Sequence, residues 1–276
     1  MMAGTILFAW CKFKGDVLPS HKTLLRLGIS GILMLVGGTG MIAWAEQYIS
    51  SGQAAILIAT EPLWFLIIDK QRWGEYFSDK FIISGLALGF TGIYLFLKFD
   101  HLHPNHSAMS TIASIVIIGS AIIWVFGSLI VKNSAEKTSA VMSSSIQLLV
   151  AGVASGIIAL AAGEFTNFSI SHVSAEAWGG LAFLVVMGSL MAYLSFMWLI
   201  AHRSPAIVST HTYVNPVVAV ILGCFLVGEK IVFWQIVSLF IILAGILLVN
   251  VPGYRNMKAG KVDNGVYEEE NGVVVK

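Results

Sequence analysis

Residues 101–131 read HLHPNHSAMSTIASIVIIGSAIIWVFGSLIV and contain no Asp, Glu, Lys or Arg. A helix crosses the roughly 30 Å hydrocarbon core of a bilayer with about 17–25 residues, and the chain has six further uncharged stretches of that length. They are Leu27–Ala45, Phe81–Leu97, Thr138–Gly163, Ala177–His202, Ser204–Gly228 and Ile231–Tyr254. An eighth stretch, Gln47–Ile68, is interrupted only by Glu61. The sequence therefore predicts eight transmembrane segments.

These segments are expected to be helices rather than barrel strands. Inside a bilayer every backbone N–H and C=O must be paired within the protein, so only helices and closed barrels span it. Strands of a membrane barrel are about ten residues long and alternate apolar with polar side chains. The stretches here are longer and uniformly apolar, which predicts an all-α polytopic membrane protein.

The composition agrees with a membrane protein. Of 276 residues 57% are apolar and 11% charged, whereas a soluble domain has about 25% charged residues. This excludes soluble enzymes, disulfide scaffolds, collagen and disordered chains. Sixteen basic against fifteen acidic residues give a net charge of +1, which argues against a nucleic-acid partner. Cys11 and Cys224 form neither a metal spacing nor a disulfide framework.

The first residues form a shorter apolar stretch. Met1–Cys11 is too short to cross a bilayer, and Lys12 and Lys14 follow it, whereas a signal peptide has its basic residues in front. We interpret it as the end of a helix that begins before this sequence.

The basic residues predict the orientation. If the segments alternate strictly, Lys98 and Lys230 are the only two of the sixteen Lys and Arg residues on one side. Basic residues are enriched in cytoplasmic loops. The sequence therefore predicts a cell-membrane protein with a cytoplasmic C-terminus, and residues 252–276 are expected to be a disordered cytoplasmic tail.

An internal repeat appears when the chain is shifted by 154 residues. The shift superimposes five pairs: Trp44 with Trp198, Ser50 with Ser204, Pro62 with Pro216, Gly74 with Gly228 and Glu75 with Glu229. The paired segments are separated by an odd number of spans, so the copies enter the membrane from opposite faces. We expect two inverted five-helix repeats, 1–98, truncated at its N-terminus, and 111–251. Inverted repeats are typical of secondary transporters.

Polar residues within the segments are candidates for the functional site. Glu61 lies deep in the membrane, where a carboxylate is costly and its charged form is disfavoured. It is our candidate for proton coupling, although it could also only hold helices together. Asn215 occupies the matching position, and each precedes a proline, Pro62 or Pro216. These prolines are expected to kink the helices beside a cavity.

Further candidates lie around these positions. His211 is four residues from Asn215, on the same helical face. Glu46 either lines the external mouth or is a solvated helix end. The other candidate ligand contacts, which could equally be packing or anchoring residues, are Trp124, Ser128, Tyr193 and Trp198.

Other motifs have structural interpretations. Gly85-x-x-x-Gly89 and Gly152-x-x-x-Gly156 permit close helix packing. His101, His103 and His106 are more typical of a solvated loop than of a metal site. We expect no metal, no cofactor and no catalytic residues, because the sequence has no nucleophile–base pair or phosphate loop.

The chain resembles the EamA-type permeases of the drug/metabolite transporter superfamily. The resemblance rests on residues 40–46 (GMIAWAE), 59–63 (ATEPL), 124–128 (WVFGS) and 213–220 (YVNPVVAV) with Gly228-Glu229 after them, and it covers Met1 to about Val251. It implies ten helices in two inverted repeats, cytoplasmic termini and a central cavity. It also implies that the matched positions, Trp44 and Thr60 among them, contact the ligand.

The leading functional hypothesis is a secondary exporter of small metabolites or drugs, amino-acid-like or amphipathic, which works by alternating access; coupling to protons is left open. Its partners are the lipid bilayer and a small-molecule substrate; a homo-oligomer is left open. A nucleotide-sugar carrier is disfavoured because no Lys or Arg lies within a span. A membrane enzyme, a sensor and an inactive truncated copy are the alternatives outside transport.

Overall fold

The computed structural model describes residues 1–99, 107–132, 138–166, 169–170, 173–202, 208, 214–222, 225 and 233–258. Its regular elements are all helical within these ranges. They are α1 (Met2–Phe13), α2 (His21–Gly31), η1 (Ile32–Gly40), α3 (Met41–Ala45), α4 (Ser51–Ile58), α5 (Glu61–Ile68), η2 (Lys70–Arg72), α6 (Trp73–Tyr76), α7 (Lys80–Phe99), α8 (Ala108–Lys132), α9 (Ala140–Ala161), α10 (Ala175–Phe183), η5 (Leu184–Tyr193), α11 (Leu194–His202), α13 (Val214–Leu222) and α14 (Phe233–Lys258).

Seven helices in the described ranges are long and apolar enough to cross a membrane. They are His21–Ala45, Ser51–Ile68, Lys80–Phe99, Ala108–Lys132, Ala140–Ala161, Ala175–His202 and Phe233–Pro252. The expectation of an all-α polytopic membrane protein is confirmed. Most of the eighth expected segment, Ser204–Gly228, lies outside the described residues, although α13 within it is helical.

Serine residues define the start of several helices. The Ser50 hydroxyl accepts a hydrogen bond from the backbone N–H of Gln53 at 3.2 Å, and the Gln53 side chain accepts one from the backbone N–H of Ser50 at 3.0 Å. This capping box satisfies donors that a helix start leaves without partners. Ser20, Ser139 and Ser174 cap α2, α9 and α10 through their side chains in the same position.

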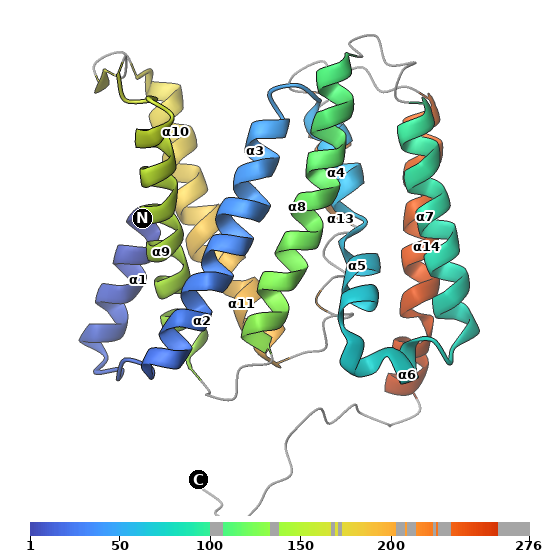
Figure 1. Cartoon of the computed structure of the whole chain (residues 1–276), viewed down its shortest axis with the longest axis horizontal. Helices are drawn as coiled ribbons and strands as arrows, with labels where there is room; N and C mark the ends of the chain where they lie inside the picture. The colour runs from blue at the N-terminus through green and yellow to red at the C-terminus, as the bar shows by residue number, and fades with distance from the viewer. Residues whose placement is uncertain are drawn as a thin grey trace, which may run out of the picture.

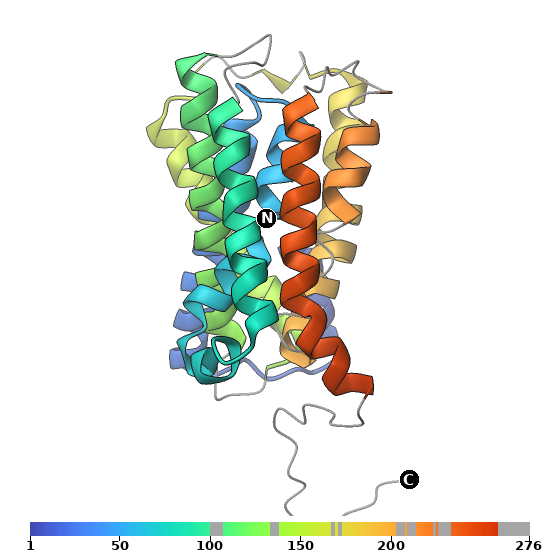
Figure 2. The ribbon, with the colours of Figure 1, turned by 90° about the vertical axis from the view of Figure 1, so that its right-hand side faces the viewer.

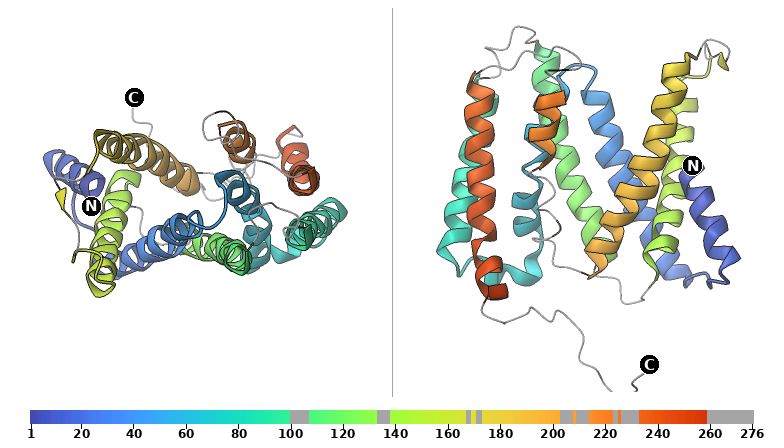
Figure 3. Two further views of the ribbon diagram at one scale, coloured as in Figure 1. Left: turned by 90° about the horizontal axis from the view of Figure 1, so that it is seen from above. Right: turned by 180° about the vertical axis from the view of Figure 1, so that it is seen from behind.

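The helices form an elongated bundle, with α1 at one end and α7 and α14 at the other (Figure 3). The segment α2–η1–α3 runs upward in Figure 1, whereas α10–η5–α11 runs downward. Helices α7 and α14 stand side by side and also run in opposite directions (Figure 2). Segments that the 154-residue shift matches therefore run in opposite directions.

The matched segments also share irregular backbone. Residues 32–40 form the π-helical segment η1. The shift places them at 186–194, which overlap the π-helical segment η5 at 184–193. Helix α5 begins at Glu61, and Asn215, the residue that matches Glu61, lies in α13. Such π-helical segments are frequent at functional sites.

Two prolines bear on where helices begin and end. Pro62 lies in the first turn of α5, directly after the turn at residues 59–60 that interrupts the span Ser51–Ile68. A missing backbone N–H costs little at this position. At the other end of the chain, α14 continues through Pro252 to Lys258, so the helix is longer than the expected boundary at residue 252.

Glycines allow the closest helix contacts. A Cβ atom on Gly85 would lie 2.5 Å from the carbonyl oxygen of Gly245, and one on Gly245 would lie 2.6 Å from the backbone nitrogen of Gly89. This confirms the packing role expected for Gly85-x-x-x-Gly89. A Cβ atom on Gly152 would collide with Met1, whereas nothing described lies within 4 Å of a Cβ atom on Gly156.

Candidate functional site

The helix that carries Glu61 is divided in two near its middle. The 18-residue span Ser51–Ile68 consists of α4 and α5, with a turn at Ala59 and Thr60 between them. The Thr60 hydroxyl donates to the carbonyl oxygen of Leu57 at 2.6 Å and accepts from Trp64 Nε1 at 3.1 Å. Thr60 thus satisfies a carbonyl at the end of α4 and fixes an indole on α5.

Glu61 follows this turn and is 5% exposed. Its Oε1 atom is buried and has no hydrogen-bond partner within the described part of the chain. A buried carboxyl without a partner is costly in a low-dielectric region. Its position at the start of α5 offsets part of this cost, because the N-terminus of a helix carries a partial positive charge. Glu61 can therefore take up a proton or a donor group from a ligand.

Aromatic side chains from three segments meet in one buried cluster. The Trp124 ring on α8 lies 5.4 Å from Phe196 on α11 and 6.3 Å from Tyr193 at the end of η5, both between ring centroids. Phe65, one turn after Glu61, belongs to the same cluster, and Trp64 packs against it. The indole Nε1 of Trp124 is buried and has no partner among the described residues.

A buried hydrogen-bond relay extends from Tyr193. The Tyr193 hydroxyl donates to Gln147 Oε1 at 3.0 Å, and Gln147 Nε2 donates to Ser30 Oγ at 2.9 Å. The Ser30 hydroxyl then donates to the carbonyl oxygen of Gly127 at 2.8 Å. All three side chains are at most 6% exposed. The relay connects α2, α8, α9 and η5.

The sequence analysis missed Ser30 and Gln147. Gln147 is an amide within the uncharged stretch Thr138–Gly163, and a polar side chain in such a stretch is a signal of an interhelical hydrogen bond. Ser30 gives a weaker signal, because serine is common in membrane helices. Its importance follows from its neighbour Gly31, where a Cβ atom would lie 2.7 Å from the backbone of Gln147.

The structure brings some of the predicted site residues together. Ser128 donates to the carbonyl oxygen of Trp124 at 2.9 Å and lies 3.8 Å from the sulfur of Met34. Trp124, Ser128 and Tyr193 therefore share one region with the aromatic cluster. Thr60 and Glu61 connect to it through Trp64 and Phe65.

Other predicted residues lie on the surface. Trp44 packs on Tyr48 at 5.1 Å, and Trp198 stacks on His202 at 4.6 Å. Glu46 and Asn215 are exposed, whereas Pro216, next to Asn215, is buried. His211 lies outside the described residues, as do His101, His103 and His106. The structure therefore does not unite all the predicted positions.

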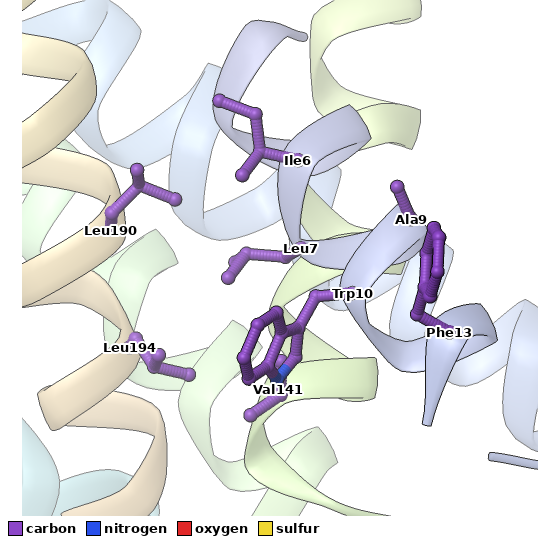
Figure 4. A pocket seen from close by; sticks show the side chains of 8 residues that line it. All are labelled: Ile6, Leu7, Ala9, Trp10, Phe13, Val141, Leu190 and Leu194. Carbon is purple, nitrogen blue, oxygen red and sulfur yellow. The ribbon is translucent and has the colours of Figure 1, made fainter. Parts of the chain in front are cut away.

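An apolar groove of about 650 Å³ lies between α1, α9 and the η5–α11 segment (Figure 4). Ile6, Leu7 and Trp10 line it from α1, and Leu190 and Leu194 line it from the other side. None of the predicted site residues that the structure describes contributes to it. Because its lining is almost entirely apolar, the groove offers few groups that could orient a polar solute.

The buried region offers both hydrogen-bonding and apolar groups. Glu61 offers an acceptor, the Trp124 indole offers a donor, and the aromatic rings offer apolar surface. These groups suit a small solute with a polar head and an apolar body. No described group pairs a nucleophile with a base here.

The EamA-like transporter family model matches residues 1–98 and 111–251. The chain belongs to the EamA-like transporter family. The family match agrees with the seven apolar helices that the described residues contain.

Two relatives illustrate what this EamA-like chain is similar to. It is 33% identical over 255 residues to the uncharacterized inner membrane transporter YedA of Escherichia coli K12. The aligned residues cover 92% of this chain and 80% of YedA. It is 22% identical over 234 residues to a protein of Streptantibioticus cattleyicolor named Probable terminal-alkyne amino-acid exporter. This alignment covers 79% of this chain and 72% of that protein.

The fold also has a counterpart among solved structures. One crystal structure of a protein superimposes with a TM-score of 0.61, covers 92% of this chain and 85% of its own chain, and is 13% identical in sequence. The identity is low, so this similarity concerns the fold alone.

Proposed function

We propose that this EamA-like transporter is a secondary active exporter of small metabolites or drugs and works by alternating access. The observation that carries the proposal is the antiparallel course of matched segments: α2–η1–α3 against α10–η5–α11, and α7 against α14 (Figures 1 and 2). Two halves of opposite topology can exchange conformations, which gives inward-open and outward-open states of similar energy. In this proposal the halves are residues 1–98 and 111–251.

The substrate binds where the divided helix meets the aromatic cluster. Five predicted residues support this location, because they are buried or partly buried and lie in or beside the aromatic cluster: Thr60, Glu61, Trp124, Ser128 and Tyr193. The predictions for Trp44, Glu46, Trp198, His211 and Asn215 remain to be tested, and Pro216 would border the same cavity. Substrates of this site are amino-acid-like or amphipathic compounds, in keeping with the name of the relative from Streptantibioticus cattleyicolor.

Glu61 couples export to protons in this proposal. Its carboxyl is buried in the middle of a span and lacks a partner at Oε1, so uptake and loss of a proton there is sensitive to whether the site is open. Each elementary charge that crosses the membrane is worth about 2.3 kcal/mol per 100 mV. This is enough to drive concentrative export.

The experiment is an efflux assay on cells that express the chain. The cells are loaded with a panel of amino acids and cationic drugs, and efflux is measured with and without a proton uncoupler. The proposal predicts that at least one compound leaves faster than from cells with an empty vector, and that the uncoupler removes the difference. No accelerated efflux of any compound contradicts it.

The proposed location is the inner membrane with the C-terminus in the cytoplasm. The support is the asymmetry of Lys and Arg between the two sides and the similarity to the inner membrane transporter YedA. A C-terminal green fluorescent protein is expected to fluoresce, whereas a C-terminal alkaline phosphatase is expected to be inactive. The reverse pattern would contradict the orientation.

A further inference from the structure

We infer that Tyr193 is a specificity-determining residue that accepts, and does not donate, a hydrogen bond from the transported solute. This rests on the proposed function, because it assumes that Tyr193 borders the substrate. The substrate class that follows is a solute whose polar head carries N–H donors, such as a primary amine.

The argument starts at the carbonyl end of the relay. A backbone carbonyl can only accept a hydrogen bond, so in the 2.8 Å contact with Gly127 the Ser30 hydroxyl is the donor. The other close contact of that hydroxyl, 3.4 Å to the sulfur of Met34, is also to an acceptor. The single hydroxyl proton of Ser30 is therefore directed to the Gly127 carbonyl and the Met34 sulfur. Toward Gln147, Ser30 can only accept.

This fixes the orientation of the Gln147 amide. Of its two ends, only the NH₂ group can donate to the Ser30 oxygen, as it does at 2.9 Å. The amide oxygen therefore faces Tyr193, at 3.0 Å from the phenol oxygen. An amide oxygen is an acceptor, so the Tyr193 hydroxyl must be the donor. The orientation of the amide follows from the hydrogen-bond network.

The consequence is that the one proton of Tyr193 is committed to Gln147. The remaining capacity of the phenol oxygen is its lone pairs, which accept. Tyr193 is the only buried residue of η5, and the π-helical backbone there departs from the regular hydrogen bonding of an α-helix. The direction of its hydroxyl is set by the relay to α9 and α2.

A site with a fixed acceptor discriminates against solutes that lack a donor, because they leave the buried acceptor without a partner. Glu61, with its buried Oε1 atom free of any described partner, adds a second acceptor to the same proposed site. Two acceptors favour an ammonium group. The aromatic cluster around Trp124 accommodates its apolar body.

A matched pair of probes separates hydrogen bonding from charge. The cations 2-phenylethylammonium and 2-phenylethyl-trimethylammonium share the ring and the charge, but only the first has N–H donors. Equilibrium binding of both is measured on the purified full chain in lipid nanodiscs. We expect the wild-type protein to prefer the primary amine by about tenfold, as for one charge-assisted hydrogen bond.

Variants of the relay give changes that a loosened fold does not produce. Tyr193→Phe removes one of the two acceptors, so the preference for the primary amine is expected to fall several-fold, and Glu61 accounts for what remains of it. Gln147→Met frees the Tyr193 proton, so a ketone with the same ring, 4-phenylbutan-2-one, is expected to gain affinity by several-fold. Ser30→Ala removes the acceptor that fixes the orientation of the Gln147 amide. The affinity for the ketone is therefore expected to rise in this variant too. Tyr94→Phe, on the exposed face of α7, is the matched control and leaves all three affinities unchanged.

The outcomes separate this inference from the carrier function. If the wild-type protein binds both cations equally or binds neither, or if Gln147→Met leaves the ketone affinity unchanged, the inference is wrong even when efflux is observed. If the selectivity and its changes are as stated but no solute is transported, the inference holds and the carrier function is wrong.

Discussion

Gly85 and Gly245 join α7 and α14 with no side chain between the two backbones, because a Cβ atom on Gly85 would lie 2.5 Å from the Gly245 carbonyl oxygen. Helix α7 follows the divided helix of the first half of the chain, and α14 follows α13 in the second. The contact therefore connects two helices that the 154-residue shift matches, at one end of the bundle (Figure 3).

Gly85→Ala is expected to lower the stability of the protein by about 1–3 kcal/mol, as for overpacking of a close contact. The added methyl group would collide with backbone, which cannot rotate away. The measurement is thermal unfolding of the purified protein in detergent. Gly119→Ala is the control, since nothing described lies within 4 Å of a Cβ atom there. Equal melting temperatures for the two variants would show that α7 and α14 do not pack through glycine.

Thr60→Val is expected to destabilise the divided helix by about 1–3 kcal/mol, because it leaves the Trp64 indole and the Leu57 carbonyl without their side-chain partner. Thr60→Ser keeps the hydroxyl and is expected to retain most of the stability. Both are compared by thermal unfolding. If serine and valine have the same effect, the hydroxyl does not hold the turn.

Glu61→Gln is expected to abolish proton-driven export while leaving exchange down a solute gradient. The amide has nearly the same volume as the carboxyl, but it cannot gain or lose a proton in this pH range. Efflux is measured in cells at several external pH values, with and without uncoupler. The variant is expected to be insensitive to both.

Glu164→Gln serves as the matched control for Glu61, because Glu164 is exposed beyond the end of α9. It is expected to retain the pH dependence and uncoupler sensitivity of the wild-type protein. If Glu61→Gln retains them too, Glu61 has no part in coupling and serves to hold helices together.

Trp124→Phe is expected to weaken binding of an amine with an aromatic body by about three- to tenfold, in line with the loss of a buried aromatic contact and of the indole donor. Trp178→Phe, on the exposed side of α10, is the control and leaves the affinity unchanged. Equal affinities of both variants and the wild-type protein would place the solute elsewhere.

Much of the fold could be predicted because the bilayer restricts it. A span without charge that is too long for a barrel strand has to be helical when it crosses lipid, so the end of α8 at Lys132 and both ends of Ala140–Ala161 lie within two residues of the uncharged stretches. The start of α8 at Ala108 is seven residues later than the uncharged stretch that begins at His101. The turn before Glu61 was harder to predict. A proline predicts either a kink or a helix start, and only the Thr60 contacts with Leu57 and Trp64 decide between them.

The candidate site was predicted in part. Trp124, Ser128 and Tyr193 were selected as rings and hydroxyls within spans, and they lie together. Ser30 and Gln147 were not selected, because their role depends on which helices are neighbours. Sequence spacing within one helix carries no information on that neighbourhood.

Counterflow in proteoliposomes tests the account most directly. Liposomes that contain the purified chain are loaded with an unlabelled primary amine, and uptake of the labelled amine from outside is followed. A carrier with alternating access is expected to take up label transiently above equilibrium, saturably, and faster than when the interior holds no amine. Uptake equal to that of protein-free liposomes, or uptake that the internal amine does not accelerate, would contradict the account.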